Sequence, residues 1–248
     1  MIDRCRYVLL SDLFRHVPLA PSVLRDVQRR MCGPRRQYHT LDHLAEMWHR
    51  HRRMARGPLR TLRGRRLVAS AIAFHDAVYN PRRSDNEVAS AVLWCRLARQ
   101  SRRLPREMIR QVAVAIEATA HHSDVTVGGA WKPWVQWVLD LDLAPIASSR
   151  QRFMTNGSHL RSEQSHLSAT AWQAHARQFY AALQRRDQIF HFPWMVTAFE
   201  ANARRHLLHA LHHRNGRDRR GLNEPKRDFP PGYRPRSRWP FFTSPSLS

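Results

Sequence analysis

The residues of this sequence best suited to chemistry are histidines and aspartates that recur in a fixed order beside apolar runs. His75 and Asp76 directly follow the apolar run Leu67–Phe74. An ionisable pair is costly to bury, and a divalent cation compensates for it because the cation offsets the carboxylate and accepts the lone pair of a neutral imidazole. Further candidate ligands follow in chain order: His39 and His43, then His122, then Asp140 and Asp142. This ordered set indicates a metal-dependent hydrolase.

The elements that must position these residues have helical periodicity nearly throughout, and no segment alternates with a period of two or carries a hairpin turn. The pattern therefore predicts an all-α fold. Short connections between helices favour a single bundle-like domain over residues 1–214. Breakers and apolar spacing predict helices over 21–32, 41–56 (with Thr40 as the N-cap), 66–79, 85 onward, 105–122, 169–185 and 194–213.

The segment Ser84-Asp85-Asn86-Glu87 has the form of a capping box, in which Ser84 is the N-cap and Glu87 bonds back to it. Glu87 therefore has two interpretations. It is either a structural partner of the cap or a carboxylate that takes part in catalysis.

The formal net charge of +23 has two interpretations as well. A strongly basic surface favours binding of nucleic acid or another polyanion. However, Lys132 and Lys226 are the only lysines, and arginines are scattered along the chain in pairs. Such a skew is typical of codon usage in a GC-rich genome, and we favour this second interpretation for the folded part.

Residues 215–248 differ in composition from the rest of the chain. Arginine and proline dominate there and aliphatic residues are few, which predicts a disordered basic tail. Aromatic residues such as Tyr233 and Trp239 are interleaved with the arginines and could stack on single-stranded nucleic acid. Nucleic acid is therefore a candidate partner for the tail and the basic surface.

Composition also bears on the compartment of the protein. No run of about 18 apolar residues is present, so we expect no transmembrane helix. The apolar patch near the N-terminus is broken by Ser11-Asp12 before a signal-peptide core could form. Cys5, Cys32 and Cys95 are odd in number and widely spaced, which favours reduced thiols. We therefore expect a cytoplasmic protein that does not engage the membrane.

The sequence resembles the HD-domain superfamily of metal-dependent phosphohydrolases, and in particular a bacterial group of predicted HD phosphohydrolases. The resemblance covers residues 8–211. The motifs that carry it are Arg36–His43, Ala73–Tyr79, Asp85–Glu87 with Ser90-Ala91, Ile116–Thr119 with His122, Leu139–Leu143 and Phe199–Arg204. The segment 156–163 also keeps Arg161 and Glu163 of the family pattern, whereas Gln164 stands where an aromatic residue is usual.

The resemblance implies an all-α HD-type bundle in which one early histidine, the His-Asp doublet and a late aspartate hold a divalent metal. On this chain the implied ligands are His43, His75, Asp76 and Asp142. His39 competes with His43 for the first position and could instead orient substrate. Asp140 competes with Asp142, and we favour Asp142. Such a mixed set suits Mn²⁺, Fe²⁺, Mg²⁺ or Zn²⁺.

The implied activity is hydrolysis of a phosphate ester or anhydride, with a nucleotide or related small molecule as the expected substrate. Asp76 would serve at the metal, Arg36 would clamp the phosphate with its fork of N–H groups, and Glu87 would be a further carboxylate of the site. His122 would bind phosphate or a second metal. The alternative is a basic nucleic-acid-binding protein that uses the helical domain as a scaffold.

Overall fold

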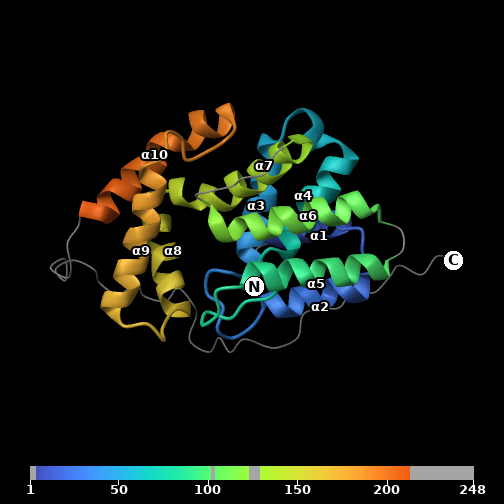
Figure 1. The fold of residues 1–248 in the computed structure, drawn as a ribbon, viewed down its shortest axis with the longest axis horizontal. Helices are drawn as coiled ribbons and strands as arrows, with labels where there is room; N and C mark the ends of the chain where they lie inside the picture. Colours follow the sequence, from blue (N-terminus) through green and yellow to red (C-terminus); the bar gives the residue numbers. More distant parts are fainter. Residues whose placement is uncertain (1–3, 102–103, 123–128, 213–248) are drawn as a thin grey trace. The chain divides into compact units, whose positions relative to one another are not determined.

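The computed structural model describes residues 4–101, 104–122 and 129–212, and within them all regular structure is helical, as the sequence predicts. The predicted domain boundary near residue 214 and the predicted disordered tail lie outside these residues. Ten α-helices and four 3₁₀-helices are present in the described part (Figure 1). The α-helices are α1 (Arg4–His16), α2 (Pro21–Met31), α3 (Leu41–Met54), α4 (Leu62–Phe74), α5 (Asn86–Gln100), α6 (Arg106–Ala118), α7 (Lys132–Leu143), α8 (Arg150–Glu163), α9 (Ala169–Gln184) and α10 (Pro193–His212). The 3₁₀-helices are η1 (Gly57–Arg60), η2 (Thr119–His121), η3 (Gly129–Trp131) and η4 (Ala144–Ala147).

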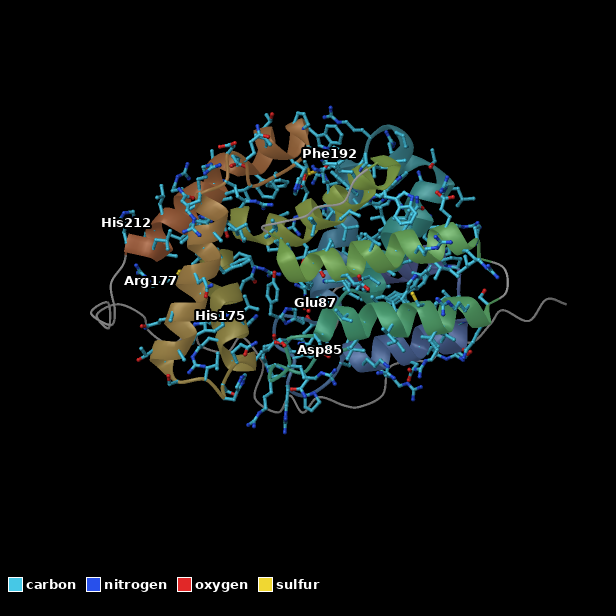
Figure 2. All side chains as sticks on the ribbon, viewed as in Figure 1. Asp85, Glu87, His175, Arg177, Phe192 and His212 are labelled. Atoms are coloured by element: carbon cyan, nitrogen blue, oxygen red, sulfur yellow. The ribbon has the colours of Figure 1, made fainter. Side chains whose placement is uncertain are left out.

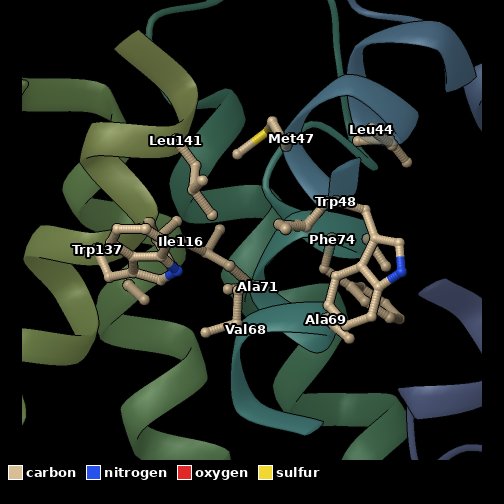
Figure 3. Packing of buried hydrophobic residues seen from close by; sticks show 14 of the residues in the cluster. Leu44, Met47, Trp48, Val68, Ala69, Ala71, Phe74, Ile116, Trp137 and Leu141 are labelled. Carbon is tan, nitrogen blue, oxygen red and sulfur yellow. The ribbon is translucent and has the colours of Figure 1, made fainter. Parts of the chain in front are cut away.

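Helix α4 is the centre of the core. Every residue of its segment Leu67–Phe74 has an exposed fraction of 0 %, because α1, α3, α5, α6 and α7 all pack against it. A helix that is apolar on all sides is typical of such a buried position. Figure 3 shows Val68 and Phe74 of α4 among side chains of α3, α6 and α7, including Trp48 and Trp137.

The start of α4 depends on a close approach to η1. Thr61 caps the helix, and its Oγ1 accepts the backbone N–H of Gly64 at 3.1 Å. A Cβ at Gly64 would lie 2.4 Å from the carbonyl oxygen of Pro58. Only glycine therefore allows η1 to pack this closely on α4.

Several predicted boundaries are wrong. The helix predicted over 105–122 ends at Ala118, where η2 follows. Two further corrections concern the surroundings of the site. The helix predicted over 66–79 begins at Leu62 and ends at Phe74. The apolar residues that follow do not extend it, because Ser90 Oγ accepts the N–H of Val78 at 3.0 Å and holds the chain in a turn. His75 therefore becomes the C-cap of α4.

The capping box predicted at Ser84 and Glu87 is wrong as well. The N-cap of α5 is Asp85, whose side chain does not cap the helix. Its carboxylate is instead held by the guanidinium of Arg83, at 2.7 and 2.6 Å. The periodicity did not predict helices α1, α7 and α8, which complete the described part.

In the residues that the structure describes, no helix has the length and apolar content needed to cross a membrane.

Candidate metal centre

Three side chains from three different helices converge at the end of α4. His43 lies in the first turn of α3, His75 caps α4, and Asp142 lies near the end of α7. His43 Nε2 is 2.9 Å from Asp142 Oδ1 and 3.3 Å from His75 Nε2. His75 Nε2 is 3.8 Å from Asp142 Oδ1. Ligand atoms about 2.1 Å from one ion lie roughly 3.0–3.4 Å apart at angles of 90–110°, so this group could hold a metal ion.

The orientation of His75 is fixed by the backbone of its own helix. Its Nδ1 lies 2.9 Å from the carbonyl oxygen of Ile72 and donates to it, so that Nε2 faces His43 and Asp142. A histidine whose second ring nitrogen donates to a carbonyl is typical of metal ligation, because this bond fixes both tautomer and ring orientation.

Asp76, the other member of the doublet, is 7 % exposed and contributes an oxygen to the same place. Its Oδ2 lies 2.9 Å from His75 Nε2, but the contact lacks the geometry of a hydrogen bond. Oδ2 is therefore a buried carboxylate oxygen with no hydrogen-bond donor. A cation would satisfy this oxygen, and on this observation the residues present fit a divalent metal.

The charges of the group lead to the same conclusion. Burial lowers the pKa of His75, but Asp76 and Asp142 outweigh this effect and raise it to about 9. Burial raises the pKa of Asp76, but His75 and His39 hold it well below its usual range. Two carboxylates and neutral imidazoles together carry a charge of −2, which a divalent cation in place of the His75 proton would balance.

Asp142 is held from both sides. Its Oδ1 faces His43, and its Oδ2 lies 2.8 Å from Nε2 of His122. Burial raises the pKa of Asp142, but the bonds from His122 and His43 lower it well below its usual range. His122 thus contacts the site through Asp142, as an orienting partner of a predicted ligand.

Asp140, the competing aspartate, serves another purpose. Its carboxylate is fully buried and accepts the backbone N–H groups of His191 at 2.8 Å and Phe192 at 3.0 Å. It also lies 2.7 Å from His191 Nδ1. Asp140 therefore fixes the segment that leads into α10, and the structure brings Asp142 to His43 and His75, as we favoured.

His39 is also absent from the ligand group and is bound to Glu163 at the end of α8. Nδ1 of His39 lies 2.5 Å from Glu163 Oε2, and Tyr79 donates its hydroxyl to the same oxygen at 2.8 Å. Glu163 Oε1 accepts three consecutive backbone N–H groups, from Gln37, Tyr38 and His39, at 2.6, 2.8 and 3.1 Å. This organising role of Glu163 was not predicted, and its match to the family pattern was the only feature of the sequence that could have indicated it.

Arg36 ties the same loop to the doublet. Its Nη1 donates to the carbonyl oxygen of His39 at 2.9 Å, and its Nη2 donates to that of Asp76 at 2.8 Å. Its guanidinium also lies over the ring of Tyr79, 5.2 Å from the ring centre. Through these contacts Arg36 positions the His39 loop relative to Asp76. To clamp a phosphate as well, Arg36 would have to use the N–H groups that are not bonded to the two carbonyl oxygens. That role stays a prediction.

Glu87 lies at the N-terminal end of α5, next to Asp85 (Figure 2). The residue beside it, Asn86, is buried and holds the loop that follows the doublet: its Oδ1 accepts the N–H of Asn80 at 2.8 Å. Nothing in the described contacts joins Glu87 to the metal ligands, so its catalytic role also stays a prediction.

Comparison with models of protein families, with curated proteins and with solved structures gives no match to this chain. The resemblance to HD phosphohydrolases therefore rests on the motifs alone, and function has to be argued from the geometry of the site.

Proposed function

We propose that this protein is a metal-dependent phosphohydrolase of the HD type. One observation carries the proposal: the His43–His75–Asp142 group and the donor-free Oδ2 of Asp76 meet at the exit of the central helix. Structural ion pairs at such depth normally satisfy their oxygens with N–H donors, as Asp140 and Glu163 do in this chain. Asp76 Oδ2 has no such donor, and a bound cation would compensate for its charge.

Each residue has a defined task in this proposal. His43, His75, Asp76 and Asp142 would hold the divalent ion, and His122 would orient Asp142. When bound, the ion lowers the pKa of a coordinated water and offsets the charge of a phosphoryl group. Arg36 would hold the doublet and the His39 loop together through its bonds to two carbonyl groups, and Glu163 would fix that loop by accepting its backbone N–H groups.

The first test is the metal content of protein purified without chelator. We expect about one divalent ion per chain in the wild type and almost none in the double variant His75→Ala/Asp76→Ala. The matched control is His49→Ala, because His49 is an exposed histidine on the same helix as His43. Equal metal content in the double variant and the control would contradict the ligand assignment.

The second test is activity. A panel of nucleotides and chromogenic phosphate esters should show turnover that depends on added Mn²⁺ or a similar ion and is abolished by Asp76→Ala. Circular dichroism must show that this variant is folded. Folded, metal-loaded wild type that is inactive on the whole panel would contradict the proposal.

The net charge of +23 keeps nucleic-acid binding as the second candidate. It predicts salt-dependent binding of single-stranded nucleic acid that weakens when the chain is shortened to end near Arg214, because fewer arginine–phosphate contacts then release counterions. Unchanged binding after this truncation would place the polyanion site on the helices.

A further inference from the structure

We propose that the substrate of this centre carries two linked phosphoryl groups, one at the metal ligands and one bound by Arg50 of α3. The inference rests on the proposed function, because it adds an anion-binding group to the same site. Arg50 follows His43 by seven residues, which is close to two helical turns, so both residues lie on the same face of α3. Long side chains of a helix lean toward its N-terminus, and for Arg50 this is the end that carries His43.

Tyr38 links Arg50 to the metal centre. The ring of Tyr38 packs against that of His43, with 5.0 Å between the ring centres. Burial raises the pKa of Tyr38 well above its usual range, and Asp142 and Asp76 raise it further. The charge of Arg50 has the opposite effect on the same hydroxyl. The Tyr38 hydroxyl is therefore close both to the carboxylates of the centre and to the Arg50 guanidinium.

The guanidinium of Arg50 is buried without a hydrogen bond. The Arg50 side chain is 18 % exposed, and its Nη1 has no hydrogen-bond partner in the part of the chain that the structure describes. Its ion-pair partner there is Glu46, whose Oε2 lies 3.6 Å from Nη1, too far for a hydrogen bond. The other carboxylate oxygen of Glu46 is bonded to Arg152 of α8. One carboxylate thus serves two guanidinium groups, and one positive charge beside the centre is left over.

Helix α8 lies across from this part of α3. Arg152 is bonded to Glu46, and Glu163, at the other end of α8, accepts the backbone N–H groups of the loop before α3. Asn156 and His159 are half-buried and lie on the same face of α8 as these two residues, because the successive spacings are four, three and four. The face of α8 that is turned toward the metal ligands is therefore polar, which suits a charged ligand.

A second phosphoryl group would supply the negative charge that Arg50 lacks. Arginine binds phosphate through two N–H groups at once, and an anion on the guanidinium would offset the cost of its burial. The phosphoryl group that is cleaved belongs at the metal ligands, where a bound ion offsets its charge. A phosphoanhydride offers one group to each position, whereas a simple monoester has only the group at the metal. The substrate class that fits best is therefore a phosphoanhydride.

The test uses the metal-loaded full chain and compounds whose P–C bonds a phosphatase does not cleave. Methylphosphonate, methylenediphosphonate and phosphonoacetate are titrated by calorimetry into the wild type, Arg50→Gln and Arg53→Gln, and the metal content is measured after each titration. The matched control is Arg53→Gln, because Arg53 is exposed on the same helix and the change in charge is the same. We expect methylenediphosphonate to bind Arg50→Gln at least about tenfold more weakly than the wild type and the control, a loss of ~1.4 kcal/mol. Methylphosphonate should bind all three proteins equally.

The outcomes separate this inference from the proposed function. Equal affinity of methylenediphosphonate for the wild type and Arg50→Gln would overturn the inference alone. Equal weakening of methylphosphonate and methylenediphosphonate in Arg50→Gln would also overturn it, because Arg50 would then only support the centre. Phosphonoacetate that binds the wild type as tightly as methylenediphosphonate would overturn the second phosphoryl group. If none of the compounds binds the metal-loaded wild type, the proposed function fails as well.

A second measurement does not depend on the folding of any variant. The side-chain ¹⁵N resonance of Arg50 in the metal-loaded wild type should shift with methylenediphosphonate and stay unchanged with methylphosphonate. A resonance that methylenediphosphonate leaves unmoved at saturation would overturn the inference.

Discussion

Nε2 of His43 and Nε2 of His75 lie 3.3 Å apart, although the two residues are 32 positions apart in the chain and belong to different helices. Both rings are buried, and Asp142 Oδ1 lies within 3.8 Å of each nitrogen. In the absence of a cation, a proton on His75 must compensate for the neighbouring carboxylates. The free energy of the folded state therefore depends on what occupies the space between these atoms.

Metal binding should stabilise the folded protein. A ligand at 100 times its Kd adds about 2.7 kcal/mol to the free energy of unfolding, which corresponds to roughly 5–10 °C in Tm for a chain of this size. We expect that increase when Mn²⁺ or Zn²⁺ is added to chelator-treated wild type and to His49→Ala, and no increase in Asp142→Asn. Equal shifts in all three proteins, followed by thermal denaturation, would mean that the ion binds elsewhere.

Asp140→Asn should separate structural from ligating aspartates. The substitution weakens the acceptor of the His191 and Phe192 N–H groups, so we expect the free energy of unfolding to fall by about 1–3 kcal/mol. Metal stoichiometry should remain that of the wild type, because Asp140 is not among the ligand atoms. Urea denaturation and elemental analysis check the two halves of this prediction, and loss of metal without loss of stability would contradict it.

Glu163→Gln should destabilise the loop that precedes α3. The glutamine lacks the charge that His39 and three backbone N–H groups require, so we expect a loss of about 2–4 kcal/mol at pH 7. Burial raises the pKa of Glu163, but these donors lower it to about 2. Because the pKa is lower in the folded state than in the unfolded chain, the stabilisation is present above about pH 4.5 and is lost as the pH falls toward 2.

The measurement for Glu163 is urea denaturation of wild type and variant at pH 7 and pH 3. The difference between them should shrink at the lower pH. Glu87→Gln is the matched control, since Glu87 is partly exposed and is not bonded to the loop. A similar loss in this control would show that the effect is not specific to the Glu163 contacts.

His51→Gln should alter the pH dependence of the free energy of unfolding in a higher pH range than Glu163→Gln does. His51 is buried, stacks on Trp48 at 4.7 Å and accepts the indole N–H of Trp137 at 3.0 Å. Burial, with a smaller contribution from Arg65, lowers its pKa from 6.5 to about 3. The unfolded chain therefore binds a proton that the folded protein does not, and stability is lost as the pH falls from about 6.5 toward 3.

We expect the stability advantage of the wild type over His51→Gln to shrink by about 2 kcal/mol between pH 7.5 and pH 5. The control is His175→Gln, which changes an exposed side chain on α9 (Figure 2). A pH-independent difference between wild type and His51→Gln, measured by urea denaturation, would contradict a buried neutral imidazole.

The helices were predictable where an apolar face and a breaker both occur, as in α2, α9 and α10. Helix α8 was not, because Glu163 is its one buried residue and no apolar stripe marks it. The end of α4 was misplaced since apolar residues continue past Phe74. The turn there depends on Asn86 and Ser90, whose bonds to the backbone of residues 78–80 no local pattern indicates.

The candidate ligand residues could be predicted from the sequence, whereas the residues that hold them in place could not. The doublet and the order of histidines and aspartates carried the ligand prediction. The choice between Asp140 and Asp142 depends on His191 and Phe192, some 50 residues downstream of Asp140. Their backbone N–H groups bind the Asp140 carboxylate, so that only Asp142 is placed beside the histidines. Likewise, the contacts of Arg36 could not be predicted, because its partners are backbone carbonyl groups and every residue type carries one.

The three N–H groups that share Glu163 Oε1 lie 124–126 residues before it. During synthesis, α1 to α7 and all the candidate ligand residues are added to the chain before the acceptor of that loop. A nascent chain that ends before residue 163 therefore holds the complete ligand set beside a loop that has not been fixed. Order in the loop before α3 therefore waits for α8, and a chain truncated before residue 163 would carry the candidate ligands without the acceptor that fixes this loop.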